Sequence, residues 1–573
     1  MRSQNILRYT IVWVPTYIVI LIGTVVSMPA QNVRGFPDDW SHHHVVFSNP
    51  GTFEEAVKNG TYERWASIVN DPRYRIQQMK RAATAAPAAG TWGSASGGGT
   101  ASGRQMHVDW ALPLAGGGNI GVAIAMYPAK FVFDQAAPPS CVNDFVVFPI
   151  DGAGSLTQAD LLGANELYVG TCTLAPVPSV LFAYFVGGGK VQTSPVLSLD
   201  GKKVAFVESR PSSIFHVLTI DKSGNAGCPN SSPCNGTAYN APAVPGTHNS
   251  AVDTKVTMSG GVAVTSSSPF VDYANDIAYV GDDTGKLHKF TGVFLGALAE
   301  AGSPWPVTVA SGIILTGPVF DGGASKNIFI GGSDGKLYCV TSAGAACSTP
   351  SITVGSTAVD DAPIVDSTHQ TVFAEAETSA NVVLAQATTA LGSQVTALMG
   401  KSSAGQHVYN GVFDSAYFAN VSTGHMYFCG NDASAHNTLL RVSFNSSGTM
   451  SSTPDPGSFA LTTAATVDCT PLTAILNTSQ GNDYLFLGIT DHGFTTGTTN
   501  CANHACLASF VLPTSSPFTF PAAAHATLTG NTGNHGLSGM IIDNVSGVAG
   551  ASQIYFGNLQ AQTAVQVSQS ALQ

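Results

Sequence analysis

The chain has 573 residues, of which only 10% are charged, and it contains 61 Gly and 31 Pro. Its formal net charge of -12 repels phosphate backbones and no basic stripe offsets that charge, so the composition argues against a nucleic-acid partner. Few charges and many turn residues are typical of β structure, because the surfaces of helices usually carry Glu, Lys and Arg.

Residues 1–30 have the composition of an export signal. Arg2 and Arg8 make a positive start, residues 11–26 form an apolar core, and small residues precede position 31. We therefore expect an exported chain that resides in the periplasm, on the cell surface or outside the cell. The alternative is that this segment stays uncleaved as an anchor, which would be the chain's one contact with a membrane.

Residues 31–84 predict a small helical segment. Thr52 and Glu55 have the spacing of a capping box, and Asp71 is placed to cap a later helix. The basic side chains of that later helix are expected on its solvent-facing side: Arg73, Arg75, Lys80 and Arg81. Residues 85–104 are rich in Gly, Ala and Ser and predict a flexible linker.

Three consecutive histidines, His42, His43 and His44, precede the apolar run "VVF". We predict that they form an extended, polar approach to a strand. Consecutive imidazoles on an extended segment point in different directions, so they do not readily reach one ion. A metal site is the alternative.

The ten cysteines fall into five couples that are close in sequence, and exported chains keep such cysteines as disulfides. The expected pairs are Cys141 with Cys172, Cys228 with Cys234, Cys339 with Cys347, Cys429 with Cys469, and Cys501 with Cys506. The last pair encloses His504 in "CANHAC", where a soft metal ion is the alternative. Connectivity does not follow from sequence alone.

Residues 105–573 form one continuous β region that repeats a short unit. The hairpin "NDIAYVGDDTGKLHKF" (275–290) returns as "KNIFIGGSDGKLYCV" (326–340), with two apolar strands around a turn of Gly, Asp and Ser. A short signature such as "TGPVFD" (316–321) precedes each hairpin. Eight units can be counted, and they begin at Met126, Thr193, Ser267, Thr316, Asp361, Asn410, Cys469 and Leu537.

The signatures often end in Asp, at a position where a carboxylate can accept backbone N–H bonds of the following turn. We interpret six of these residues as turn caps, with cation binding as the alternative: Asp200, Asp272, Asp321, Asp366, Asp414 and Asp543. The turns "GDDTGK" and "GSDGK" lack the spacing of calcium-binding and phosphate-binding loops.

Units of this length predict an all-β fold, a β-propeller of seven or eight blades, with eight preferred. The strand "QMHVDWALPL" (105–114) has no unit of its own. We expect it to join the last blade, the one begun by the strand "QIYFGN", and so to close the ring.

The hairpins of residues 275–290 and 326–340 resemble the repeat of PQQ-like, or quinoprotein-like, propellers. "LSLDGKKVAFVES" (197–209) is similar to the WD40-like repeat of TolB-type propellers. The resemblance implies an exported bacterial propeller and says little about activity. Quinone-dependent dehydrogenases of this family carry a tryptophan docking motif, where this chain has Phe290 and Val340, and a disulfide of adjacent cysteines, which it lacks. The family's outer-membrane assembly propellers bind partner proteins and carry a lipid-modified cysteine that this chain also lacks.

The leading functional hypothesis is a non-catalytic binding or scaffolding module that contacts an envelope or extracellular protein or a glycan through rim loops. Long ordered loops tend to carry binding surfaces, so residues 221–250 and 489–506 are the candidate loops, with His248, Asn249, His492 and His504 as candidate contacts. No cofactor is expected, although calcium and a quinone stay open. The alternative is an atypical quinone-type oxidoreductase or a hydrolase that uses the central funnel.

Overall fold

The computed structural model describes these residues: 35–82, 106–114, 121–134, 137–172, 177–221, 244–246, 250–260, 264–465, 467–477, 481–489, 506–513, 515–519, 524–527, 536–543 and 553–569. All of them belong to one unit, Arg34–Gln573. The predicted export signal, the predicted linker and most of the two candidate loops lie outside the described residues. The domain boundaries proposed from the sequence therefore stay predictions.

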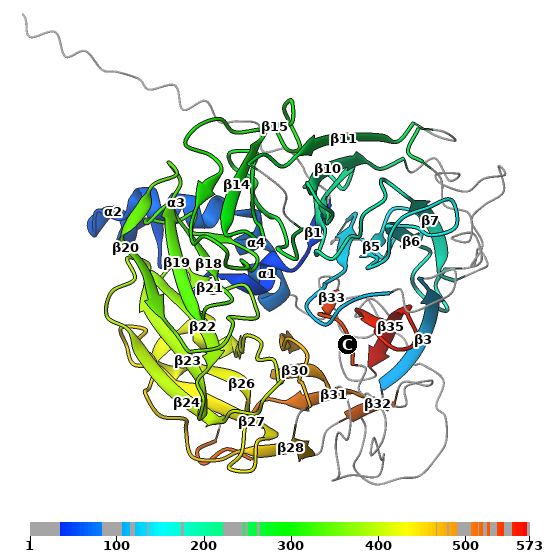
Figure 1. Cartoon of the computed structure of the whole chain (residues 1–573). Coiled ribbons are helices and arrows are strands. Elements are labelled where there is room, and N and C mark those ends of the chain that lie inside the picture. Colours follow the sequence, from blue (N-terminus) through cyan, green and yellow to red (C-terminus); the bar gives the residue numbers. More distant parts are fainter. Residues whose placement is uncertain are drawn as a thin grey trace, which may run out of the picture. The chain divides into compact units, whose positions relative to one another are not determined.

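Eight antiparallel sheets surround one axis, and the chain is an eight-bladed β-propeller, as predicted (Figure 1). Blade 1 consists of β4 (Ala129–Val132), β5 (Phe145–Pro149), β6 (Leu161–Asn165) and β7 (Ser179–Tyr184), and blade 2 of β8 (Val196–Leu197), β9 (Lys203–Glu208), β10 (Ile214–Thr219) and β11 (Val252–Thr257). Blade 3 consists of β12 (Phe270–Asp272), β13 (Ile277–Gly281), β14 (Lys286–Thr291), β15 (Ala299–Glu300) and β16 (Val307–Thr308). Blade 4 consists of β17 (Val319–Phe320), β18 (Asn327–Gly331), β19 (Lys336–Thr341) and β20 (Ala346–Thr353).

Blade 5 consists of β21 (Ile364–Asp366), β22 (Thr371–Glu377), β23 (Asn381–Thr388) and β24 (Val395–Lys401), and blade 6 of β25 (Val412–Phe413), β26 (His425–Asn431), β27 (His436–Ser443) and β28 (Phe459–Ala465). Blade 7 consists of β29 (Thr473–Asn477), β30 (Asn482–Ile489), β31 (Cys506–Val511) and β32 (Ala524–Thr527). Blade 8 consists of β33 (Ile541–Asp543), β34 (Gln553–Asn558), β35 (Thr563–Gln569) and β3 (Met106–Pro113). The first strand of each blade lies within the sequence signature, for example β17 within "TGPVFD" (316–321). First strands of neighbouring blades contact one another around the axis.

The strand predicted to close the ring does so. Strand β3 pairs antiparallel with β35, so the last blade has the order β3-β35-β34-β33. Hydrogen bonds between distant parts of the chain thus join blade 8 to the segment that leads into blade 1.

The repeated hairpin owes its shape to its turn. In β13 and β14, Gly281 lies opposite Leu287, and the carboxylate of Asp282 accepts the backbone N–H groups of Thr284 and Lys286 at 2.9 and 2.8 Å. Gly285 has a φ of +90°, and a Cβ there would lie 1.6 Å from the Ala310 carbonyl oxygen. Only glycine fits such a position, which explains the Gly-Lys-Leu of the repeat.

Five of the six signature aspartates cap turns as predicted. Each accepts a backbone N–H from two or three residues later, at 2.8–3.1 Å: Asp200, Asp272, Asp321, Asp366 and Asp414. Asp543 differs, because its carboxylate lies 3.0 Å from the Nζ of Lys130 and accepts a hydrogen bond from Tyr168. The residues that follow Asp543 are outside the described part of the chain.

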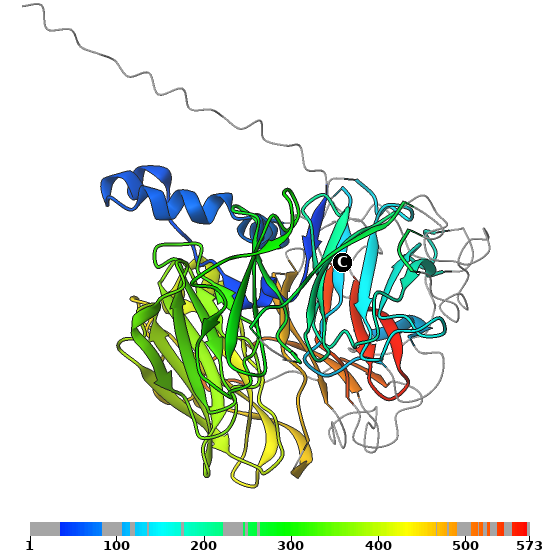
Figure 2. The same ribbon diagram turned by 45° about the horizontal axis from the view of Figure 1, so that its top comes forward.

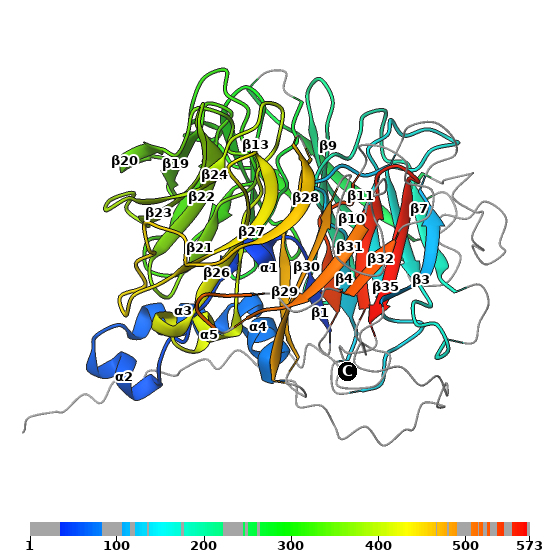
Figure 3. The same ribbon diagram turned by 90° about the horizontal axis from the view of Figure 1, so that it is seen from below.

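Three helices lie on one face of the propeller (Figures 2 and 3): α2 (Phe53–Lys58), α3 (Tyr62–Asn70) and α4 (Pro72–Ala82). The predicted capping box forms, since Thr52 accepts the Glu55 N–H and Glu55 accepts the Thr52 N–H. A short helix α5 (Ser415–Ala419) and a 3-10 turn (Val421–Thr423) follow β25. No helix in the described ranges is long and apolar enough to cross a membrane.

The segment before these helices enters the centre of the ring (Figure 1). Strand β1 (Phe36–Asp38) pairs with β4 of blade 1, helix α1 (Ser41–His44) follows, and β2 (Val45–Val46) pairs in parallel with β21 of blade 5. Blades 1 and 5 are opposite in an eight-bladed ring, so this segment crosses the channel. The predicted extended conformation of the three histidines is therefore wrong: they form a helical turn, because the chain must reverse between two strand pairings.

The predicted solvent-facing side of α4 is also wrong for most of its basic residues. Arg73 is only 1% exposed, the Lys80 side chain is 20% exposed and Arg81 is half-buried, whereas Arg75 is exposed. These cations face inward because they meet the propeller rather than water. Arg73 donates to the Val271 carbonyl of blade 3, and Lys80 donates to Asp38 and to the Ile542 carbonyl of blade 8.

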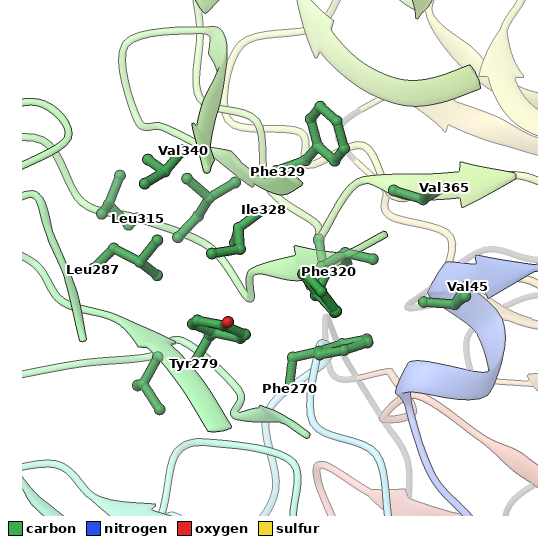
Figure 4. Packing of buried hydrophobic residues seen from close by; sticks show 14 of the residues in the cluster. Val45, Phe270, Tyr279, Leu287, Leu315, Phe320, Ile328, Phe329, Val340 and Val365 are labelled. Carbon is green, nitrogen blue, oxygen red and sulfur yellow. The ribbon is translucent and has the colours of Figure 1, made fainter. Parts of the chain in front are cut away.

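Buried apolar side chains fill the spaces between neighbouring blades. In Figure 4, Phe270 and Tyr279 of blade 3 lie beside Phe320 and Ile328 of blade 4, and Val45 lies beside them at the end of α1. The central segment is therefore part of the hydrophobic core.

Three predicted disulfides are present, namely Cys141–Cys172, Cys339–Cys347 and Cys429–Cys469. Cys506 is also disulfide-bonded, while Cys228, Cys234 and Cys501 lie outside the described residues.

Two buried histidines of neighbouring blades each lie between two carboxylates. Their contacts are His216 Nδ1 to Asp253 at 3.0 Å and Nε2 to Glu208 at 3.3 Å, and His288 Nδ1 to Glu300 at 2.6 Å and Nε2 to Asp282 at 3.2 Å. Burial lowers the pKa of each imidazole, but the hydrogen bonds to carboxylates outweigh burial and leave both pKa values raised. Those bonds likewise hold the pKa values of Glu208, Asp282 and Glu300 low against the effect of burial.

We expect these two sites to make the unfolding midpoint depend on pH. A raised histidine pKa contributes stability that is complete below about pH 6.5 and is lost as pH rises through the folded-state pKa. The lowered carboxyl pKa values contribute stability that is complete above about pH 4.5 and is lost as pH falls further. Urea midpoints of His216→Asn/His288→Asn should therefore fall less between pH 6 and 9 than those of the parent chain. His107→Asn, at a side chain 77% exposed, is the control, and equal slopes in all three proteins would contradict the assignment.

Candidate functional site

A cavity of about 360 Å³ lies in the central channel. Its walls come from the loops that lead into the first strands of blades 1 to 5. In each of these loops the residue directly before the signature proline lines the cavity: Tyr127, Ser194, Ser268, Gly317 and Ala362. Proline begins the strand where its missing N–H does no harm, and the residue before it is directed into the channel.

Hydroxyl groups dominate the polar lining, which includes Ser194, Ser266, Ser268, Thr316 and Ser333. Several already have structural partners. Ser194 accepts the Tyr127 N–H and Ser268 accepts the Ser194 N–H, both at 2.9 Å, so a chain of bonds joins blades 1, 2 and 3. Thr316 accepts the Gly331 N–H at 3.0 Å. The Ser194 and Ser268 hydroxyls can still donate to a ligand, because accepting one hydrogen bond leaves the O–H proton available, whereas Thr316 already donates to the Gly317 carbonyl at 3.4 Å.

Hydroxyls near the axis repeat one bond from blade to blade. In four blades a signature Ser or Thr accepts the N–H of the glycine that ends the second strand or lies within it: Ser267 with Gly281, Thr316 with Gly331, Thr470 with Gly488, and Ser538 with Gly557, at 2.7–3.0 Å. In these four blades the signature hydroxyl therefore holds the first strand of the blade to the second.

Helix α1 closes one side of the cavity. Trp40 is 2% exposed and donates its indole N–H to the Pro269 carbonyl at 3.1 Å. His44 has both ring nitrogens engaged, Nδ1 with the Trp40 carbonyl at 2.9 Å and Nε2 with Asp361 at 3.1 Å. An imidazole held on both sides fixes the position of the segment from β1 to β2, which we call the central plug, and it is not free to exchange protons with a ligand.

Two adjacent carboxylates form the acidic part of the lining. Both carboxylate oxygens of Asp361 have hydrogen-bond partners, since they accept from His44, from the Ala362 N–H and from the Asn410 N–H. Asp360 accepts only the Val408 N–H, at 3.3 Å. Burial raises the pKa of Asp360 to about 6, and nearby His407 reduces that rise.

A third carboxyl, Glu375 of β22, is fully buried behind these two. Neither of its oxygens has a hydrogen-bond partner, and burial, followed by the charges of Asp361 and Asp360, raises its pKa well above the usual value. Burial of Glu375 therefore favours the protonated form of its carboxyl. Nearby, a hydrogen bond to Asp468 raises the pKa of His407 to about 9, so this imidazole is a cation that offsets the acidic group.

The residues predicted as functional fare differently. His248, Asn249, His492 and His504 lie outside the described residues. The three histidines lie on different sides of α1: His44 lines the channel cavity, while His42 and His43 line a smaller pocket. Among described residues, the one group placed to hold a metal ion is Cys141, Glu166 and Cys172. The two sulfurs are joined in a disulfide, so they offer no thiolate ligands.

Sequence reasoning missed the channel lining, although a signal was present. The residue before proline recurs in the signatures of blades 1 to 5, and a fixed position in each repeat of a propeller faces the same way. Asp361 begins the fifth signature and Asp360 directly precedes it, and their closeness to the residue before proline could have marked them.

No protein-family model matches this chain, and no curated protein matches it in sequence. Solved structures with a similar fold include Sqt1 from Chaetomium thermophilum, 12% identical, covering 81% of this chain and 99% of that one, with a TM-score of 0.46. BamB from Moraxella catarrhalis is 11% identical and covers 81% of this chain and 97% of its own, with a TM-score of 0.38.

The β-propeller domain of Cps50 (Swd1) from Myceliophteria thermophila is 7% identical, covers 81% of this chain and 99% of its own, and has a TM-score of 0.36. Such distant likenesses carry no argument about activity. The PQQ-like and TolB-type repeat assignments stay predictions, and the strand order itself establishes an eight-bladed propeller with a hydroxyl-lined cavity that α1 closes on one side.

Proposed function

We propose that this chain is an exported, non-catalytic binding propeller that contacts an envelope or extracellular protein or a glycan through the loops around its channel. The channel cavity supports this proposal most directly. Its described lining combines hydroxyls, two carboxylates and the aromatic rings of Trp40 and Tyr127, and it contains no Lys or Arg. Such a lining suits a polar group that is neutral or cationic, for example sugar hydroxyls or a basic side chain.

Export is supported by the three disulfides, since structural disulfides persist in oxidising compartments and are rare in the cytosol. The cavity also reaches solvent, because Ser266 and Ala125 in its lining are exposed and Ile314 is 48% exposed. A partner in the same compartment would thus have access to it.

One observation favours a second function, a hydrolase that uses the channel. The carboxyl of Asp360 lines the cavity and has its pKa raised to about 6. A carboxyl that titrates near neutral pH suits general acid or base catalysis. Calcium or a quinone as a cofactor is not part of either proposal.

The binding proposal is tested by narrowing the cavity. Gln192 and Ala358 are half-buried in its lining, so Gln192→Trp/Ala358→Trp should reduce capture of proteins from envelope extract, or of glycans on an array, by at least about tenfold, equivalent to about 1.4 kcal/mol. Leu295→Trp, at a side chain 86% exposed outside the cavity, is the control and should bind like the parent chain.

Unchanged capture by Gln192→Trp/Ala358→Trp would show that the binding surface lies outside the channel. Absence of capture by the parent chain would contradict the proposal of a binding protein. Chemical change of a captured ligand, abolished in Asp360→Asn, would favour the hydrolase.

A further inference from the structure

A second, smaller cavity of about 90 Å³ lies on the other side of α1. It is enclosed by helix α4 and by the first strands of blades 6 and 7, and Figure 3 shows α4 close to β29. Its apolar wall consists of Val46, Ile76, Val412, Phe413, Phe418 and Ile475. We call it the α4 pocket.

Two buried hydrogen-bond donors of the α4 pocket have no partner, Nε2 of His42 and Nη1 of Arg81. The His42 side chain is only 4% exposed. Its Nδ1 accepts the Asp39 backbone N–H at 3.1 Å in the tautomer that carries the ring proton on Nε2, and the same Nδ1 lies 3.3 Å from the Asp39 carbonyl oxygen and 3.4 Å from the Asp39 carboxylate. An unpaired buried donor costs about 1–3 kcal/mol, and more when it is charged, so both groups favour a ligand that accepts hydrogen bonds.

The other basic groups of the α4 pocket are not available in this way. Lys80 donates to Asp38 and to the Ile542 carbonyl. Burial lowers the pKa of His43 to about 3, so that imidazole is neutral. Arg81 is therefore the cation that a ligand would meet.

Arg81 and Asp483 both line the pocket and interact electrostatically, yet they form no ion pair with each other. The Arg81 guanidinium lies 3.3 Å from the ring centre of Phe418. Asp483 accepts the backbone N–H and the hydroxyl of Ser415 on a single oxygen, at 2.8 and 2.6 Å. The pocket thus presents a cation and an anion that stay apart within an apolar wall.

We propose that the α4 pocket binds a small α-amino acid in its zwitterionic form. Its carboxylate takes the hydrogen bonds of Arg81 and His42, its ammonium group faces Asp483, and its side chain packs against Phe413 and Ile475. A simple anion would be repelled by the Asp483 carboxylate, and a simple amine would be repelled by the Arg81 guanidinium. A cavity of about 90 Å³ admits a small side chain and excludes an aromatic one.

This site is independent of the proposed channel function, because α1 separates the two cavities. Burial, partly offset by Asp483, lowers the pKa of Arg81 to about 9, so Arg81 stays charged at neutral pH. Burial raises the pKa of Asp483 against its two bonds from Ser415. A bound zwitterion would relieve the unfavourable burial of both charges.

Titration calorimetry on the full chain at pH 7 tests the proposal with glycine, L-alanine, L-valine, L-phenylalanine, acetate, methylamine and phosphate. L-alanine should bind at least about tenfold more tightly than acetate or methylamine, because each of these loses one charged contact. L-phenylalanine should not bind. Arg81→Met and Asp483→Asn should each weaken L-alanine binding by at least about tenfold. Arg75→Met, on the exposed side of the same helix, should bind like the parent chain.

Asp483→Asn keeps an oxygen for the Ser415 bonds, so it serves as the second variant should Arg81→Met fail to fold. Phosphate or acetate binding as tightly as L-alanine would replace the proposal with a simple anion site. No heat with any amino acid would overturn it. Gln192→Trp/Ala358→Trp should bind L-alanine normally, which keeps the outcome separate from that of the channel test.

Discussion

Replacing Lys130 by Met is expected to lower the free energy of unfolding by about 3–5 kcal/mol, the usual cost of removing one partner from a buried ion pair. Lys130 is 0% exposed, and its Nζ lies 3.0 Å from Asp543. A second carboxylate, Asp144, accepts the Tyr168 hydroxyl at 2.7 Å, and Tyr168 also contacts Lys130. The substitution would leave the buried Asp543 carboxylate without its cation and would remove the Lys130 contact of Tyr168, which donates to Asp144.

The position of the pair makes this loss serious for the whole ring. Lys130 belongs to β4 of blade 1 and Asp543 to β33 of blade 8, so the pair bridges the seam at which the propeller closes. Burial raises the pKa of Asp543, and the adjacent Lys130 counteracts that rise. Without Lys130 the carboxyl would take up a proton or destabilise the seam.

Urea unfolding measures the effect, with Lys336→Met as the matched control. Lys336 forms a 2.9 Å ion pair with Asp334, but its side chain is 42% exposed, and exposed pairs contribute less than about 1 kcal/mol. Lys130→Met/Asp543→Asn should recover part of the lost stability, because it removes the carboxylate that Lys130→Met leaves unpaired. Equal losses in Lys130→Met and Lys336→Met would contradict the argument.

The second large effect is expected at the anchor of the central plug. Arg73 donates to the Ser41 hydroxyl and to the Val271 carbonyl, both at 2.7 Å, and lies over the rings of Phe270 and Tyr273. Arg73→Met should therefore lower the free energy of unfolding by about 3–5 kcal/mol, because it removes both buried hydrogen bonds and both ring contacts of the guanidinium. It should also speed amide hydrogen exchange in α1 and β2 far more than in blades 6 and 7.

Arg75→Met is the control, since Arg75 lies on the same helix but is exposed, and surface substitutions usually change stability by less than about 0.5 kcal/mol. Exchange that rises evenly over the whole propeller would show that Arg73 acts on global stability and not on the plug.

Local patterns explain why the blades could be predicted. A hairpin needs only alternating apolar residues and a turn with a glycine of positive φ, and all of these lie within about 16 residues of sequence. The Asp caps, the capping box at Thr52 and the disulfides between near neighbours such as Cys339 and Cys347 are equally local. The closing strand could be inferred because a ring of sheets leaves one strand without a unit.

The candidate site could not be predicted in the same way. The channel cavity takes one or two residues from each of five blades, and α1 reaches it from a segment that has no repeat. His42 to His44 seemed extended from their sequence, but the two pairings of β1 and β2 require a helical turn between them. The basic residues of α4 are expected to face solvent because they are charged, and the neighbouring propeller covers three of them, Arg73, Lys80 and Arg81.

The sequence by itself indicated the repeated sheets, their turns and the close couple of Cys339 and Cys347, because each depends on residues near one another in the chain. The tertiary structure alone decided that Lys130 meets Asp543, that Arg73 holds the plug against blade 3, and that Arg81 and Asp483 face one pocket. Such contacts join residues far apart in the chain. Their energies come from burial and charge pairing in the folded state, which no local period records.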